Sequence, residues 1–223
     1  ATTFNQKAEA LYQQNVLSVM EEVWHKEGER IDLVIFLNGI AIFTFELKCN
    51  TSGQNYEDAI RQYKFERDYK TRLLKFKAGC LAHFAIDLNE VYMCTNLKGK
   101  SSFFLPFNKG CGVGIHSGKG NPHNENGINV SYMWEDILKK DTVLYLIDKI
   151  IFLQKETKKD PDTGKRVTKE TLIFPRYHQF NAVRKLVEDV VEHHSEKNYL
   201  IEHSAGSGKT NTIAWLAHRL ASL

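Results

Sequence analysis

The sequence is poor in cysteine and has no long apolar run. Its four cysteines, Cys49, Cys80, Cys94 and Cys111, form no C-x-x-C pair, which argues against a zinc ribbon and favours reduced thiols. No apolar run approaches the length of a membrane span, and no charged and then apolar leader opens the chain. We therefore expect a soluble, cytoplasmic protein that has no membrane partner.

A strong charge of one sign is also missing. Lys and Arg number 30 against 27 Asp and Glu, which leaves a net charge of +3. Composition alone therefore does not indicate nucleic-acid binding, and any basic surface must be local. The hydrophobic content of 42%, with 13 Phe and 9 Tyr, is ample for a packed core. The length of 223 residues fits one large domain or one and a half.

Apolar spacing along the first half predicts helices and strands of an α/β domain. Helical spacing covers residues 4–23, and a hairpin over residues 32–48 is followed by a long helix over residues 55–77. Short strand-like runs follow between residues 83 and 107. This order favours a mixed sheet flanked by helices. The candidate core positions of the first helix are Ala8, Leu11, Val16, Val19 and Met20.

The second half changes its pattern several times. Residues 109–129 are rich in Gly and Asn and predict a long irregular loop, which is often functional. Helical spacing returns over residues 130–154, and the charged residues 155–170 read as a linker or an exposed hairpin. From Thr171 the pattern predicts a helix, a strand over residues 199–203, a glycine loop and a final helix.

The hairpin carries three ionisable groups on two otherwise apolar strands. Asp32 lies at its start, Glu46 and Lys48 lie at its end, and an Asn38-Gly39 turn lies between them. Buried charges are costly unless they pair or hold a metal. Carboxylate oxygens suit Mg²⁺, and a Lys two residues after the Glu shares its strand face, where it can polarise an attacking water. We interpret the three as a phosphodiester-cleaving Mg²⁺ site; an exposed Glu46–Lys48 surface pair is the alternative.

Strand parity sets a condition on this site. A plain two-residue Asn38-Gly39 loop in a regular ladder pairs Asp32 with Phe45 and turns Glu46 to the other face of the sheet. A three-residue loop with Gly39 as a left-handed bulge instead brings the three ionisable groups to one face. The chemistry therefore predicts the bulged loop or a compensating bulge elsewhere in the hairpin.

Basic residues recur along the long predicted helix at spacings that form one stripe. They are Arg61, Lys64, Arg72 and Lys75. Such a stripe could bind DNA backbone phosphates without sequence choice. A solvated charged helix face is the alternative.

A phosphate-binding loop follows the strand predicted over residues 199–203. Its candidate nucleotide-binding residues are Gly206, Ser207, Gly208, Lys209 and Thr210. Backbone N–H groups and the helix N-terminus would hold the phosphates, Lys209 would reach the β- and γ-phosphates, and Thr210 would bind Mg²⁺. His203 stands where the pattern has its first Gly. We expect the complete protein to bind ATP; a glycine-rich helix cap is the alternative.

Few residues follow Thr210, and none of them can form the strand of paired acids that orders the hydrolytic water. We therefore expect the chain to be part of a longer protein and to hydrolyse no ATP by itself.

Four stretches of the chain together resemble the R subunit of type I restriction enzymes. They are Asp32 with Glu46-Leu47-Lys48, residues 104–110 with 120–122, residues 174–179, and residues 199–210. The first resembles the PD-(D/E)xK nuclease motif, with Ile31 in place of the Pro that often precedes the Asp. Because the four stretches run through nearly the whole chain, the resemblance is more specific than either motif alone.

The resemblance implies the domain organisation and the site roles. It implies a PD-(D/E)xK endonuclease-like domain over residues 1–140, a connecting helix and charged linker over residues 141–170, and the start of a RecA-like motor domain of helicase superfamily 2 over residues 171–223. Asp32 and Glu46 would be the metal ligands, and Lys48 the water-polarising base.

Accessory roles also follow from the resemblance. Gln179 resembles the glutamine that reads adenine ahead of the phosphate loop. Tyr63 fits the Tyr of the family's Q-x-x-x-Y pattern, whereas Ala59 occupies the Gln position and Gln62 lies next to the Tyr. Gln62 and Tyr63 are therefore candidate accessory nuclease residues.

The implied activity is that of a type I site-specific deoxyribonuclease. It would cleave double-stranded DNA with Mg²⁺, coupled to ATP-driven translocation, in a complex with methyltransferase (M) and specificity (S) subunits. Two alternatives stay open: a repair or recombination nuclease–helicase, and a catalytically silent DNA- or ATP-binding module. The loop over residues 109–129 is a candidate for joining nuclease to motor.

Overall fold

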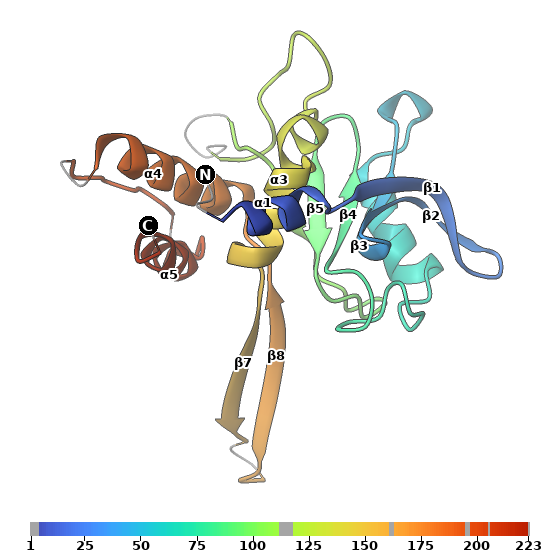
Figure 1. Cartoon of the computed structure of the whole chain (residues 1–223). Helices are drawn as coiled ribbons and strands as arrows, with labels where there is room; N and C mark the ends of the chain where they lie inside the picture. Colours follow the sequence, from blue (N-terminus) through green and yellow to red (C-terminus); the bar gives the residue numbers. More distant parts are fainter. Residues whose placement is uncertain (1–4, 112–117, 161–162, 195–196, 205, 223) are drawn as a thin grey trace. The chain divides into compact units, whose positions relative to one another are not determined.

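The computed structural model in Figure 1 describes residues 5–111, 118–160, 163–194, 197–204 and 206–222. The chain divides into two compact units, unit 1 (residues 1–105) and unit 2 (residues 106–223). This division does not test the domain limits predicted at residues 140 and 170, which stay predictions. Among the described residues, no helix is both long and apolar enough to cross a membrane.

Unit 1 is built on a mixed sheet flanked by helices, which confirms the predicted fold class. The strand order is β1-β2-β3-β4-β5-β6, with β3 and β4 parallel and the pairs β1/β2, β2/β3 and β4/β5 antiparallel. The parallel pair needs a crossover, which α2 and the π-helical segment η2 supply. The strands are β1 Leu17–Lys26, β2 Glu29–Leu37, β3 Ile40–Leu47, β4 Ala82–Ile86, β5 Val91–Cys94 and β6 Leu105–Pro106; the helical segments are α1 Gln6–Gln13, η1 Asn50–Ser52, α2 Tyr56–Arg61 and η2 Gln62–Glu66.

The first predicted helix is shorter than expected. α1 ends at Gln13, and the chain from Leu17 onward pairs with β2 as a strand at the sheet edge. The N–H of Val16 donates to Asn38 Oδ1 at 2.8 Å, which fixes the start of this pairing. The prediction that the apolar residues of this segment belong to the core was therefore wrong, because they face solvent on α1 and along the edge strand β1. The exposed residues are Ala8, Leu11, Val16, Val19 and Met20.

The helix predicted over residues 55–77 also ends early. Asn55 and Asp58 form a capping box at the start of α2, and η2 ends at Glu66. Arg67 then takes an extended conformation, with φ −111° and ψ 130°, because its side chain reaches Glu46 at 2.7 Å. The predicted single helical stripe was wrong, since two of its four members lie in turns beyond η2. The four are Arg61, Lys64, Arg72 and Lys75.

The core of unit 1 joins the sheet to α2 and η2. One buried cluster consists of Ile31, Val34, Tyr63, Leu74, Cys94 and Leu97. The Tyr63 hydroxyl lies 2.9 Å from Thr44 Oγ1, which lies 2.8 Å from His83 Nδ1. These buried polar groups satisfy one another, as burial requires. They hold η2 against β3, the strand that carries Glu46.

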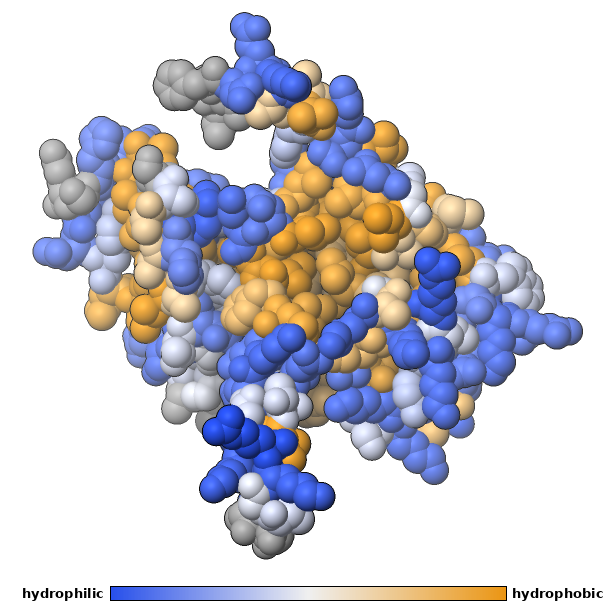
Figure 2. All heavy atoms as spheres, turned by 60° about the horizontal axis from the view of Figure 1, so that its bottom comes forward, coloured by the Kyte–Doolittle hydropathy of each residue, from blue (hydrophilic) through white to orange (hydrophobic). Residues whose placement is uncertain are grey.

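Unit 2 contains a long exposed hairpin and the two predicted helices. β7 and β8 pair in register over their whole length, so the expectation of an exposed hairpin over residues 155–170 is confirmed. Figure 2 shows its hydrophilic end coming forward at the bottom of the view. The elements are η4 Met133–Ile137, α3 Lys140–Tyr145, η5 Leu146–Ile150, β7 Phe152–Lys159, β8 Arg166–Ile173, α4 Tyr177–His193 and α5 Lys209–Leu220.

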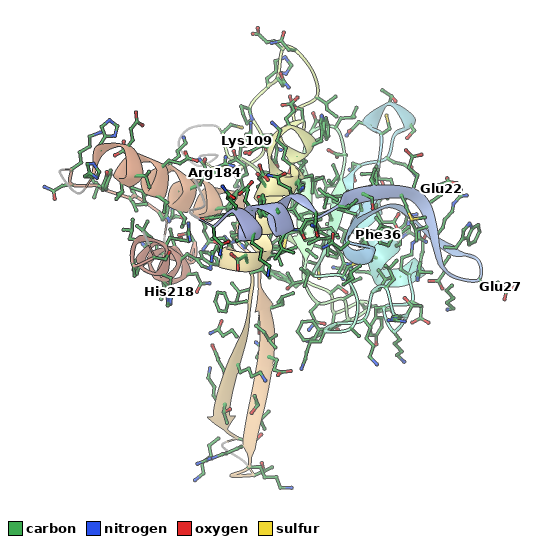
Figure 3. All side chains as sticks on the ribbon, viewed as in Figure 1. Glu22, Glu27, Phe36, Lys109, Arg184 and His218 are labelled. Carbon is green, nitrogen blue, oxygen red and sulfur yellow. The ribbon has the colours of Figure 1, made fainter. Side chains whose placement is uncertain are left out.

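Ion pairs and rings stabilise unit 2 around α4. Arg184 of α4 donates two hydrogen bonds of 2.7 Å to Asp136, and these bonds, more than the nearby Lys109, lower the pKa of the Asp136 carboxyl. Figure 3 labels Arg184 and Lys109. Lys109 Nζ also lies 5.0 Å from the centroid of the Tyr132 ring. The Trp215 indole of α5 donates to the Ile150 carbonyl at 2.8 Å.

The strand predicted over residues 199–203 does not form. These residues have no strand conformation, and Leu200 is 96% exposed. A strand needs a hydrogen-bonded neighbour, and no strand among the described residues pairs with this segment. The prediction was wrong because an apolar, strand-like sequence is not sufficient without a sheet to join.

Candidate functional site

The hairpin of β2 and β3 turns through two residues. Asn38 and Gly39 have φ values of 52° and 79°, the left-handed values that a two-residue hairpin turn requires. Leu37 accordingly pairs with Ile40 across the turn. The bulged three-residue loop is therefore not the solution found at this corner.

A bulge beyond the turn restores the register that the site needs. The pairing of β2 with β3 shifts between Ile35 and Phe36, where Ile42 of β3 is left without a partner on β2. Continuing the shifted register along β2 places Asp32 opposite Glu46 on one face of the sheet. The compensating bulge predicted from strand parity is confirmed.

The two carboxylates have different surroundings. Asp32 is half-buried, and its Oδ2 accepts a hydrogen bond of 2.7 Å from the Leu47 N–H. Glu46 is fully buried, and its Oε1 accepts a hydrogen bond of 2.7 Å from Arg67 Nε. Glu46 Oε2 is also buried but has no hydrogen-bond partner among the described residues. An unpaired buried carboxylate oxygen is costly, so this atom is where a cation would be stabilised.

The protonation of Glu46 follows from these contacts. Burial raises the pKa of Glu46 to about 7, the hydrogen bond from Arg67 acts against that rise, and the charge of Asp32 adds to it. A cation between the two carboxylates would favour their ionised forms. Glu46 would therefore be ionised more readily when a cation lies beside it.

Lys48 follows the last residue of β3. Its N–H donates to the Ile86 carbonyl of β4 at 2.8 Å, which fixes the end of the strand. Its half-buried side chain lies two residues beyond Glu46, and its charge acts to lower the pKa of Glu46. The structure thus brings Asp32, Glu46 and Lys48 to one end of the hairpin.

The two accessory candidates lie on η2. Burial raises the pKa of the Tyr63 hydroxyl well above its usual range, and the nearby Glu46 and Asp32 charges add to this. Tyr63 is therefore close to both carboxylates. Gln62 is half-buried, and its side-chain oxygen has no hydrogen-bond partner within the described part of the chain. The roles of both residues stay predictions.

The two carboxylates suit Mg²⁺ better than a metal such as structural zinc, whose ligands all come from the protein. Within the described residues, no group of three or more His, Cys, Asp or Glu side chains could hold a metal ion. Structural zinc sites need four such ligands. Mg²⁺ keeps several waters and takes one or two carboxylates together with substrate phosphates. Two carboxylates and the unpaired Glu46 Oε2 are consistent with that requirement.

Arg67 is the residue at this site that sequence reasoning missed. Its side chain is 10% exposed, and it is the hydrogen-bond donor to Glu46. The two residues are far apart in sequence and meet only because η2 ends at Glu66. An arginine directly after a helical run gives no signal of a tertiary partner, so the pattern could not have revealed it.

The glycine loop of unit 2 opens a helix as predicted. Gly206 and Gly208 have φ values of 72° and 84°, and α5 starts at Lys209 directly after Gly208. Lys209 Nζ donates to the His203 carbonyl at 3.0 Å, and Thr210 is exposed. The lysine thus bends back over the loop.

Gln179 holds this loop against α4. Its Oε1 accepts from the Arg176 N–H at 2.8 Å, and its Nε2 donates to the Gly208 carbonyl at 2.9 Å. A Cβ on Gly208 would lie 2.4 Å from Gln179 Nε2 and would displace that side chain, and the φ of 84° also favours glycine there. Ser207 is buried, and its hydroxyl has no hydrogen-bond partner in the part of the chain that the structure describes. The predicted adenine-reading role of Gln179 stays a prediction.

Comparison with known proteins gives matches over both halves of the chain. Residues 172–223 match the family of the type III restriction enzyme res subunit, which fits the start of a helicase-like domain. A protein of Methanocaldococcus jannaschii, named as the endonuclease subunit of the type I restriction enzyme MjaVIIIP, is 29% identical over 222 residues. That match covers 92% of this chain, and the chain spans 18% of the relative's length. Residues 7–102 match the family of the type I restriction enzyme R protein N terminus.

Proposed function

We propose that unit 1 cleaves phosphodiester bonds of double-stranded DNA at Asp32, Glu46 and Lys48. The observation that supports this most is the buried Glu46 carboxylate, whose Oε2 has no hydrogen-bond partner among the described residues. Asp32 and Glu46 would hold one Mg²⁺, which would supply charge stabilisation at the scissile phosphate. This pair of ligands leaves the remaining coordination positions to water and phosphate oxygens.

The other residues of the site have distinct roles in this proposal. Lys48 polarises the attacking water and holds it near the phosphate. Arg67 orients Glu46 through its 2.7 Å hydrogen bond to Oε1, which leaves Oε2 as the oxygen that would hold the cation. Gln62 and Tyr63 support the carboxylates from η2. The DNA backbone contacts predicted for Arg61, Lys64, Arg72 and Lys75 remain part of the proposal, although they do not share a helix.

We propose a second site for Mg²⁺-ATP in the complete protein. Gly206, Ser207 and Gly208 would surround the phosphates with N–H groups at the start of α5. Lys209 would exchange the His203 carbonyl for a phosphate oxygen. Thr210 would bind the Mg²⁺, and Gln179 would read adenine. The ATP would drive translocation along DNA by the RecA-like motor of the complete protein.

The complete protein would act in a cytoplasmic complex with methyltransferase and specificity subunits, which would choose the DNA site. Its activity would be that of a type I site-specific deoxyribonuclease. The R protein family match over residues 7–102 favours this assignment over a repair or recombination nuclease–helicase and over a silent binding module.

The test is an ATP-dependent cleavage and translocation assay of the full-length subunit assembled with both partners. We expect Lys48→Ala to retain translocation and to lose cleavage by at least about 100-fold, because it removes the group that polarises water. We expect Lys209→Ala to lose both activities. Cleavage at the wild-type rate in Lys48→Ala would contradict the nuclease assignment, and translocation at the wild-type rate in Lys209→Ala would contradict the ATP site.

A further inference from the structure

Two loops of unit 1 form a groove, and of its lining residues the proposed function uses only Lys75. One loop follows η2 (residues 67–80) and the other follows β5 (residues 95–104), and they lie side by side in Figure 1. The groove has a volume of about 420 Å³. Three of its lining residues are lysines and none is acidic. They are Tyr69, Lys70, Lys75, Phe76, Asn96, Leu97 and Lys98.

Buried residues hold both loops in place. Leu74 of the first loop is fully buried, and Leu97 of the second is 2% exposed, in the same core cluster. Gly99, with φ +58°, lies so close to Tyr69 that a Cβ would meet its ring at 3.4 Å. The lysines next to these anchors, Lys75 and Lys98, therefore extend from ordered backbone. Rigid backbone reduces the entropy lost when a ligand binds.

The positive charges around the groove are not neutralised within the described part of the chain. Lys70, Lys75, Lys98 and Lys100 are exposed and make no ion pair with a described carboxylate. We call these four residues the lysine surface. Asp68, an acid within the first loop, already pairs with Lys26 at 3.2 Å. Four like charges that have no ion-pair partner of their own repel one another, and an anionic ligand would relieve this repulsion.

Aromatic rings lie among these lysines. Lys70 Nζ lies 6.0 Å from the centroid of the Tyr69 ring, and Lys100 Nζ lies 5.9 Å from that of Phe65. Phe65 is 59% exposed. Rings that contact both the lysine stems and the solvent give a surface that suits a sugar–phosphate backbone, which has anionic oxygens and apolar sugar faces.

One short stretch of chain links this surface to the two carboxylates. Tyr63 of η2 is buried against β3 near Glu46, Arg67 contacts Glu46 at 2.7 Å, and Tyr69 lines the groove. We propose that the lysine surface binds the phosphate backbone of the double-stranded DNA that is cut at Glu46. The inference rests on the proposed nuclease function and adds the β5 loop, with Lys98 and Lys100, to the DNA contacts.

The binding has a defined salt dependence. Each lysine that neutralises a phosphate releases condensed counterions, so the logarithm of the binding constant falls with the logarithm of salt concentration by about 0.9 per contact. Four contacts therefore contribute a slope of roughly −3 to −4. Contacts of this kind give affinity without choice of sequence.

The test uses the whole 223-residue chain and a short fluorescein-labelled duplex without divalent metal. Fluorescence anisotropy is followed at several KCl concentrations. The test variant carries Lys70→Gln, Lys75→Gln, Lys98→Gln and Lys100→Gln. The matched control removes the same charge from the exposed hairpin, with Lys158→Gln, Lys159→Gln, Lys165→Gln and Lys169→Gln. Circular dichroism checks that both variants keep the fold.

The expected result is a dissociation constant at least about ten-fold higher for the test variant, with a salt slope flatter by roughly 3. In the control variant, the dissociation constant and the salt slope should both differ much less from the wild-type values. Equal losses in the two variants, wild-type affinity in the test variant, or no DNA binding by the wild-type chain would overturn the proposal. None of these outcomes affects metal binding at Asp32 and Glu46, so a failure of this surface is distinct from a failure of the nuclease site.

Discussion

At the scale of single residues, Glu46 carries the main energetic cost of the site. It is a fully buried carboxylate that, among the described residues, has one hydrogen-bond donor, Arg67, and one oxygen without a partner. Removing one partner from a buried ion pair leaves an uncompensated charge, which costs more than the pair contributes. The site is therefore stabilised by Arg67, which positions Glu46 and contacts no reacting atom in the proposed reaction.

We expect Arg67→Met to lower the free energy of unfolding by about 3 kcal/mol at pH 8. The loss should be smaller at pH 6, because the Glu46 carboxyl, whose pKa is already raised to about 7, then takes up a proton. Urea unfolding followed by circular dichroism measures this. The control is Lys155→Met in the exposed pair with Glu170, which should cost about 0.5 kcal/mol or less. Equal effects of the two substitutions would show that the Arg67 contact is not buried.

The pH dependence of stability should report His83. Burial lowers the pKa of His83 to about 3, against 6.5 for an exposed histidine. Between these values the unfolded chain binds one more proton than the folded chain, so stability is complete above about pH 6.5 and falls with decreasing pH by about 1.4 kcal/mol per pH unit. His83→Asn, which keeps a hydrogen-bonding group toward Thr44, should remove this slope. An unchanged slope between pH 6.5 and pH 4 in urea titrations would contradict the buried, neutral histidine.

At the scale of elements, the hairpin decides which residues meet. Asn38 and Gly39 set a plain two-residue turn, and the bulge at Ile42 then brings Asp32 opposite Glu46. Sequence parity was enough to predict that a bulge must exist. Parity could not show whether the bulge lies in the Asn38-Gly39 turn or farther along the strands, because that depends on how β3 packs against β4.

The turn residue Asn38 also holds the start of β1. Its side chain accepts from the Val16 N–H at 2.8 Å and donates to Asn15 at 2.9 Å. We expect Asn38→Ala to cost about 1–2 kcal/mol, since it removes both bonds and strains the positive φ. Asn38→Gly should cost less, because it removes the bonds but relaxes the backbone. Chemical denaturation of the two variants would separate the loss of the hydrogen bonds from the backbone strain. An equal loss of stability in both variants would show that the positive φ at position 38 adds no strain.

The failed element predictions share one physical cause. Residues 17–20 and 199–203 have apolar spacing that fits more than one structure, and pairing partners decided both outcomes. The long predicted helix ended at Glu66 because Arg67 and Asp68 make tertiary contacts instead. Propensity and periodicity are local properties, whereas these contacts join segments that are distant in sequence. The predictions that succeeded, α4, α5 and the β7–β8 hairpin, concern segments with strong local signals.

At the scale of the whole molecule, the two proposed sites lie in two different compact units. Asp32, Glu46 and Lys48 belong to unit 1, and the glycine loop before α5 belongs to unit 2. The near-neutral net charge of +3 is consistent with local rather than global basic surfaces. Because the chain spans 18% of its relative, coupling between the two sites is a property to test in the full-length protein.

The central claim is that Asp32 and Glu46 hold a divalent cation. A titration of the 223-residue chain with Mn²⁺, followed by electron paramagnetic resonance, tests it directly, since Mn²⁺ takes the same oxygen ligands as Mg²⁺. We predict one bound Mn²⁺ for the wild-type chain and for Lys209→Ala, and a loss of that site in Asp32→Asn. The same stoichiometry and affinity in Asp32→Asn as in the wild-type chain would contradict the account.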